Sequence, residues 1–269
     1  MASHDVNAAA YGSAAGVDYH VNPDTVVGLS LAGAGLQWNL SSGLGNGQGD
    51  AIQAGVYGAT RFNRFYVAGA FGFANHWINT NREALGDSLT ANFGAQSYGG
   101  RIEGGYRLPF AMPIPLPIFQ APIAIVPYAA VQPQVFHTPA YSENDIGGAG
   151  FGLNYNSADA TDVRTEVGFR ADTVTYLGAG PSATKIDLFT RTAWAHDFTN
   201  TPSLDAVFQT LPGANFTVYG ARTPHNSALV SDGAQLWLTS SLSIIAKFDG
   251  ELAGDANIYA GTGTLRYTW

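Results

Sequence analysis

Apolar and polar side chains alternate at every second position through long stretches of this chain. In residues 162–172, Val163 and Phe169 lie at one set of alternate positions, while Arg164 and Glu166 lie at the other. Successive side chains of a β-strand point to opposite faces, so such a segment is amphipathic only as a strand. The same period of two is found in residues 97–108, 185–195 and 242–251. The pattern therefore predicts an all-β protein.

The alternating segments predict eleven strands, most of them longer than those of soluble proteins. Strands of about 10 residues cross a bilayer at a tilt, whereas soluble strands average about 5–6 residues. A soluble antiparallel sandwich with one wet face is the alternative, since it gives the same alternation. The expected strands are residues 9–21, 25–39, 49–62, 65–79, 92–108, 124–138, 160–174, 185–198, 226–239, 242–251 and 256–269.

Charged residues are scarce in this chain. They make up 12% of it, against about 25% in typical soluble domains, which indicates that part of the surface does not meet water. The longest uncharged apolar stretch, Leu108 to Tyr128, contains six prolines, a density that rules out a membrane-spanning helix. We therefore predict a single domain over residues 1–269, folded as a transmembrane antiparallel β-barrel.

Composition excludes several classes of site and partner. The absence of cysteine rules out a disulfide framework and a thiolate zinc site. A net charge of −8 supplies no basic stripe for phosphates, so no nucleic-acid partner is expected. Residues 1–5 do not open a signal peptide, because no charged region is followed by an apolar core. An outer-membrane precursor needs such a peptide, so we expect the chain to begin within a longer protein.

The predicted connections alternate between short and long. Residues 22–24, 63–64 and 240–241 are suited to tight turns, while residues 43–49, 79–86 and 199–225 are long or polar. Bacterial barrels place short turns in the periplasm and long loops outside the cell. The alternation would assign the proline-rich segment, residues 109–127, to the periplasm, although it is long.

The two faces of the predicted strands differ in chemistry. One face is apolar and is expected to meet lipid; its members include Val163, Val167, Phe169, Ile186, Leu188, Trp194, Ile244 and Phe248. The other carries charges of both signs and is expected to form a lumen polar network of Arg101, Glu103, Arg164, Glu166, Arg170, Asp187, Arg191, Lys247, Asp249, Glu251 and Arg266. Mixed charges at this density favour a structural salt-bridge network, with a polar pore or an acid–base site as the alternatives.

A search for catalytic groups finds no convincing cluster. No Gly-x-Ser-x-Gly motif occurs, and the six histidines are too scattered for metal-ligand spacing. His196 and Asp197 are adjacent in a strand and therefore point to opposite faces. Residues 178–183 fit a dinucleotide fingerprint formally, but Pro181 and the lack of a following helix favour a turn. We predict no enzyme activity, no cofactor and no metal site.

The last residues place apolar side chains at steps of two up to the final position. Leu265, Tyr267 and Trp269 would share the lipid face of a terminal strand. This pattern resembles the C-terminal signal of outer-membrane proteins, which the barrel-assembly machinery reads. The resemblance implies that these three residues form an assembly signal.

Further segments resemble the autotransporter β-domain family, in family order and over nearly the whole chain. They are residues 15–19, 97–107, 126–129, 164–170, 193–198, 211–216 and 248–252. The resemblance implies a type V secretion translocator in the outer membrane of a Gram-negative bacterium. Such a barrel anchors a covalently attached N-terminal passenger and helps to deliver it to the cell surface. A small outer-membrane pore or diffusion channel is the alternative function.

The family architecture has twelve strands, the first of which follows a helix threaded through the lumen. Neither this helix nor the first strand is recognisable here, so we expect a domain that lacks both of them and the passenger. Eleven antiparallel strands leave the first and last running in the same direction. Antiparallel closure then fails and leaves an unpaired seam between residues 9–21 and residues 256–269.

Overall fold

The computed structural model describes residues 6–108, 123–178, 180, 183–198, 202–220, 224–254 and 256–269. Regular structure in these residues is β-strand, apart from the short 3₁₀ turn η1, Ser41–Gly43. Among them, no helix has the length and apolar character needed to cross a membrane.

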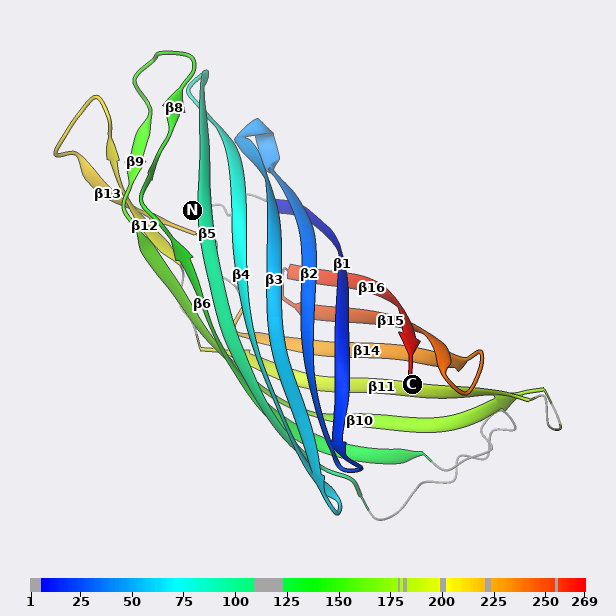
Figure 1. The fold of residues 1–269 in the computed structure, drawn as a ribbon. Coiled ribbons are helices and arrows are strands. Elements are labelled where there is room, and N and C mark those ends of the chain that lie inside the picture. The colour runs from blue at the N-terminus through cyan, green and yellow to red at the C-terminus, as the bar shows by residue number, and fades with distance from the viewer. Residues whose placement is uncertain are drawn as a thin grey trace.

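Eleven strands follow one another in a single curled sheet, and each neighbouring pair is antiparallel (Figure 1). This confirms the predicted number and order of strands. In sheet order they are β1 (Val6–Asn22), β2 (Thr25–Leu40), β3 (Gly45–Phe62), β4 (Phe65–Ala84), β5 (Asp87–Tyr106), β6 (Ala124–Thr138), β10 (Ala158–Leu177), β11 (Thr184–Asp197), β14 (Asn226–Trp237), β15 (Leu242–Ala253) and β16 (Ala256–Tyr267).

The register keeps the two faces of the sheet distinct. Glu166 on β10 pairs with Ala195 on β11 and Ala130 on β6, all three of them buried on the concave face. The neighbouring Val167 lies on the convex face and is 57% exposed. Because side chains alternate along every strand, this register continues the division around the whole sheet.

The strands are long enough to cross a membrane. The shortest of the eleven have 12 residues and the longest have 20. At a rise of about 3.3 Å per residue and a tilt of about 45°, 12 residues cover about 28 Å of depth, close to the ~25 Å apolar band of outer-membrane barrels.

The sheet is open between β1 and β16. Figure 1 shows β1 to β5 forming one wall of the curled sheet and β10 to β16 forming the other. Every residue of β1 and of β16 is exposed, and among the described residues no strand pairs with the outer edge of either. Eleven antiparallel strands make these two edges run in the same direction, so the predicted seam is confirmed for the described part of the chain.

Three loop predictions need correction. Residues 79–86 are not a long loop, because β4 continues to Ala84 and a tight turn follows at Leu85 and Gly86, which have φ values of 52° and 87°. Residues 43–49 mostly belong to β3, which begins at Gly45. The stretch 199–225 contains two further strands, β12 (Ser203–Phe208) and β13 (Asn215–Tyr219). Residues 109–122 of the proline-rich segment lie outside the described residues.

A second, four-stranded sheet stands at the end of the molecule where the long connections lie (Figure 1). Its order is β13, β12, β9 (Leu153–Tyr155) and β7 (Tyr141–Ser142). The two-residue strand β8 (Asn144–Asp145) pairs instead with β5 of the main sheet. Alternation could not predict these strands, because they are too short to show a period.

Candidate functional site

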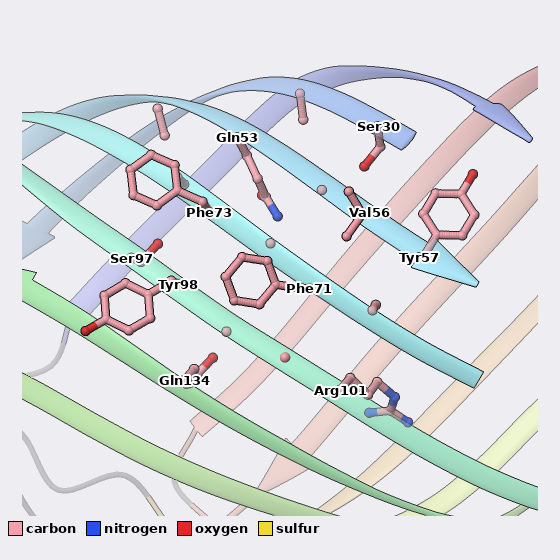
Figure 2. A pocket seen from close by; sticks show the side chains of 18 of the residues that line it. Ser30, Gln53, Val56, Tyr57, Phe71, Phe73, Ser97, Tyr98, Arg101 and Gln134 are labelled. Carbon is pink, nitrogen blue, oxygen red and sulfur yellow. The ribbon is translucent and has the colours of Figure 1, made fainter. Parts of the chain in front are cut away.

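The concave face of the sheet is hollow in its N-terminal half. A cavity of about 480 Å³ lies against β2 to β6, and Figure 2 shows Ser30, Gln53, Ser97 and Gln134 among the residues that line it. Small residues line much of the rest of it. A second cavity, of about 950 Å³, lies toward the short turns and is bordered by Arg61. The concave face therefore forms a polar lumen.

Five charged residues of the predicted network meet at the centre of this lumen. Arg101 lies 2.8 Å from Glu103 and 2.7 Å from Glu166. Arg170 forms a second ion pair with Glu103, at 2.5 Å, and Arg191 approaches Glu166 at 3.7 Å. Both carboxylates are only 5% exposed, so the arginines supply the charge compensation that water does not. We call these five residues the central network.

Two tyrosines complete the central network. The Tyr66 hydroxyl donates to Glu103 at 2.7 Å, and the Tyr128 hydroxyl donates to Glu166 at 3.2 Å. The Arg170 guanidinium lies 4.6 Å from the centroid of the Tyr128 ring, within cation–π range. The sequence analysis did not select these tyrosines. The register places them on the lumen face, because Tyr66 pairs with Gly105 on β5 and Tyr128 pairs with Gly168 on β10.

A glycine makes room for Tyr66. The Tyr66 ring lies over Gly105 of the neighbouring strand, where an added Cβ would come within 2.3 Å of it. A side chain at this position would displace the ring from Glu103. The absence of a side chain at Gly105 thus allows the Tyr66 ring to reach Glu103.

A separate cluster joins three strands nearer the long connections. Arg164 on β10 donates two hydrogen bonds to Asp197, at 2.7 and 2.9 Å, and two to Glu251 on β15, at 3.2 and 2.8 Å. Asp197 is buried with 7% of its side chain exposed. The sequence analysis considered Asp197 only beside His196, as a catalytic pair, yet its position at steps of two from Arg191 would have placed it in the lumen.

The remaining residues of the predicted network are more peripheral. Asp187 pairs with Lys185 at 3.0 Å and accepts a hydrogen bond from Trp237 at 2.6 Å. Lys247 pairs with Asp249 on its own strand at 2.8 Å. Arg266 lies on the open-edge strand β16, and no ion pair to it is found among the described residues.

The opposite face is apolar, as the alternation indicates. Phe169, Val167 and Trp194 are 60%, 57% and 53% exposed, and Phe248 and Ile244 are 47% and 43% exposed. Val163, Ile186 and Leu188 are partly exposed on the same face. An apolar surface that continues across so many strands marks a face that meets something other than water.

The terminal strand presents its predicted signal residues on this face. Leu265, Tyr267 and Trp269 are 70%, 62% and 83% exposed. Tyr267 pairs with Leu242, and the Thr268 amide donates to the Ser241 carbonyl at 2.7 Å. The side chains of Leu265, Tyr267 and Trp269 are therefore available to another molecule.

Candidate catalytic groups are kept apart by the fold. His196 bonds to Asn226 on the outer face, while Asp197 bonds to Arg164 in the lumen. In the part of the chain that the structure describes, no three His, Cys, Asp or Glu side chains are grouped as metal ligands.

The outer four-stranded sheet is attached to β4 through one ion pair. Arg82 donates to both oxygens of Glu143, at 2.8 and 2.6 Å, and Glu143 also accepts from the Leu153 amide at 3.0 Å. Tyr141 stacks between Phe93 and Tyr155, at centroid distances of 4.0 and 4.6 Å. Burial raises the pKa of both phenols, that of Tyr155 to about 12, so both are neutral at physiological pH.

Comparison with known proteins gives one family and several similar structures. The model of the autotransporter β-domain family matches residues 2–249. No curated protein matches the sequence.

Solved structures that share the fold include three autotransporter domains. The translocator domain of the autotransporter NalP from Neisseria meningitidis has a TM-score of 0.76 at 12% identity, covering 99% of this chain and 82% of that one. The β-domain of the Bordetella autotransporter BrkA has a TM-score of 0.68 at 16% identity, covering 98% and 92%. The transport unit of the autotransporter AIDA-I from Escherichia coli has a TM-score of 0.57 at 12% identity, covering 99% and 84%.

Proposed function

The chain belongs to the autotransporter β-domain family of Gram-negative outer membranes, and we propose that it anchors an N-terminal passenger and helps to deliver it to the cell surface. The observation that carries this proposal is the direction of β1. Val6 pairs with Leu40, next to η1, and β1 ends at Asn22 in a tight turn. β1 therefore begins at the end with the long connections, which in bacterial barrels faces outward. A strand that precedes β1 and pairs antiparallel with it would begin at the opposite end, so a passenger outside the cell would be joined to that strand through the lumen.

We infer that a twelfth strand closes the barrel. The edges of β1 and β16 run in the same direction, so one strand antiparallel to both can pair with each. Each unpaired backbone group in hydrocarbon costs several kcal/mol, which makes an open seam untenable in a bilayer. The twelve-stranded architecture of the family supports this inference.

The lumen charges serve a structural purpose in this proposal. The central network joins β5 to β10 and β11, and the Arg164 cluster joins β10, β11 and β15. Each carboxylate of these two groups accepts a hydrogen bond from at least one arginine, so neither group supplies a free acid or base for catalysis. The domain acts as a transport structure and not as an enzyme of an external substrate.

The terminal strand supplies the recognition signal for assembly. Leu265, Tyr267 and Trp269 form an exposed apolar row on the outer face at the end of the chain described. The barrel-assembly machinery is the partner that this row fits, and outer-membrane lipid covers it after assembly.

An epitope-accessibility experiment tests the direction of the chain. In cells expressing the full-length protein, an epitope inserted directly before residue 6 should bind antibody without permeabilisation. The matched control is the same epitope between Asn63 and Arg64, in a tight turn at the opposite end. That epitope should bind only after the outer membrane is permeabilised. Reversed accessibility would refute the proposal.

The cavity of about 950 Å³ in the lumen favours a pore as the second candidate function. Conductance of the purified full-length protein in planar bilayers separates the two candidates. A translocator occupied by its own chain should conduct poorly. Stable, large conductance of the intact protein would favour the pore.

A further inference from the structure

Each of the two edge strands of the open sheet carries a single charged side chain. Asp18 is the only Asp, Glu, Lys or Arg residue of β1, and Arg266 is the only one of β16. Among the described residues, neither side chain forms an ion pair. Charged residues of membrane-spanning segments usually face the interior and pair with one another. The two edges of the seam therefore hold charges of opposite sign that lack ionic partners.

Both charges face the lumen near the end with the short turns. Asp18 pairs with Gly28, and Gly28 pairs with Tyr57, which lines the lumen cavities. Arg266 pairs with Ser243, which is 1% exposed on the inner face. β1 and β16 run in the same direction and both end at the short turns (Figure 1). Asp18 and Arg266 therefore lie in the corresponding halves of the two edge strands.

Tyr57 orients the Asp18 carboxylate. The Tyr57 hydroxyl donates a hydrogen bond to Asp18. To reach it, the Tyr57 ring passes over Gly28, where an added Cβ would come within 2.4 Å of the ring. Arg266, on the other side of the seam, is close enough for its charge to act on the Tyr57 hydroxyl. The carboxylate thus has one partner in place and a cation within electrostatic range.

The central network contains a complete group of the same composition. Glu166 accepts from the Tyr128 hydroxyl at 3.2 Å and from Arg101 at 2.7 Å. The strands of Arg101 and Glu166 are separated by β6, which presents the small, buried Ala130 beside Glu166. At about 4.7–4.9 Å between neighbouring strands, an arginine of this lumen reaches a carboxylate on a strand about 9.5 Å away.

We propose that Arg266 pairs with Asp18 across the closing strand and completes a second tyrosine–carboxylate–arginine group with Tyr57. The pair rests on the proposed twelfth strand, which places β1 and β16 two strands apart, as β5 and β10 are. The closing strand then presents a glycine, alanine or serine to the lumen between the two charges, as β2 presents Gly28 under Tyr57. The ion pair stabilises the seam at the end with the short turns.

Hydrogen exchange in a double-mutant cycle tests the pair in the full-length protein, refolded in detergent so that cellular assembly plays no part. Asp18→Asn and Arg266→Gln should each speed exchange of the seam amides, residues 11–19 and 259–267, about tenfold, because each removes the same interaction. The double variant should exchange no faster than either single variant. Asp18→Arg combined with Arg266→Asp should restore part of the protection.

A lumen cation of the neighbouring strand serves as the matched control. Lys247 on β15 pairs with Asp249 of its own strand, so Lys247→Gln should leave exchange of the seam amides unchanged. Residues 164–169, which lie between β6 and β11, report whether each variant is folded. Their amides should stay protected in every member of the cycle.

Additive effects of Asp18→Asn and Arg266→Gln would overturn the proposal, because charges that do not interact act independently. Unchanged exchange in both single variants would do the same. If a single variant loses protection at residues 164–169, the charge-swapped chain decides, since only an ion pair restores its fold. Rapid exchange of the seam amides in the unaltered full-length protein would instead refute the twelfth strand, and the ion pair with it.

Discussion

Arg101 and Glu166 lie 65 positions apart in the chain and form a bidentate ion pair, with hydrogen bonds of 2.7 and 2.8 Å. The strands that carry them, β5 and β10, are not neighbours, because β6 lies between them. A bidentate arginine–carboxylate pair has fixed geometry and is stronger than a single contact. This pair therefore joins parts of the lumen wall that backbone hydrogen bonds do not join directly.

Loss of Arg101 should destabilise the barrel strongly. Arg101→Gln leaves Glu103 and Glu166, each 5% exposed, short of a donor, and should cost about 3 kcal/mol of unfolding free energy. The matched control is Arg107→Gln, whose pair with Asp172 is about half exposed and should cost less than about 1 kcal/mol. Urea unfolding in detergent measures both, and equal midpoints would contradict the role of the central network.

Arginine on the outer face should be tolerated poorly. Phe169→Arg should cost about 2–4 kcal/mol if the position lies at mid-depth in the bilayer. The neighbouring Gly168 is unsuitable as a control, because a Cβ there would come within 2.4 Å of the Thr192 carbonyl oxygen. Gln134→Arg is the better control, since Gln134 faces the lumen and already bonds to Asp162. Equal stability of the two variants in lipid would show that Phe169 does not face the lipid.

Removal of Tyr267, Thr268 and Trp269 should block assembly in cells. The truncated chain loses only the Leu242–Tyr267 pairing and one backbone hydrogen bond to Ser241, so folding in detergent should persist. Its outer-membrane level should nevertheless fall at least tenfold. Tyr259→Ala, which removes an equally exposed aromatic ring from the same strand, should assemble normally. Normal outer-membrane levels of the truncated chain would refute the assembly signal.

Hydrogen exchange should reveal the seam in a chain of residues 1–269. Amides of residues 11–19 and 259–267 that point away from β2 and β15 have no partner strand among the described residues. They should exchange far faster than those of residues 164–169, which lie between two strands. Addition of the preceding strand should protect the same amides. If both edges of the monomeric 1–269 chain are as protected as residues 164–169, a strand pairing has been missed.

Alternation predicted the large strands well. Each of them has the lumen on one side and the outer surface on the other, so the surroundings change at every residue, as the side-chain direction does. The eleven expected strands all form, and most boundaries lie within a few residues of those observed. The pattern failed at η1 and at the outer sheet, where strands such as Tyr141–Ser142 are too short to show any period. It also missed Asp197, whose position after a histidine drew attention to catalysis and away from the lumen face.

The amino-acid sequence by itself determined the strand count, the lipid and lumen faces, and the polar character of the interior. These depend on local alternation, which each strand displays independently of its neighbours. Only the tertiary structure decided which charges meet, because partner choice depends on register and on the curl of the sheet. Arg101 could have paired with any lumen acid until the strands brought Glu166 within 2.7 Å.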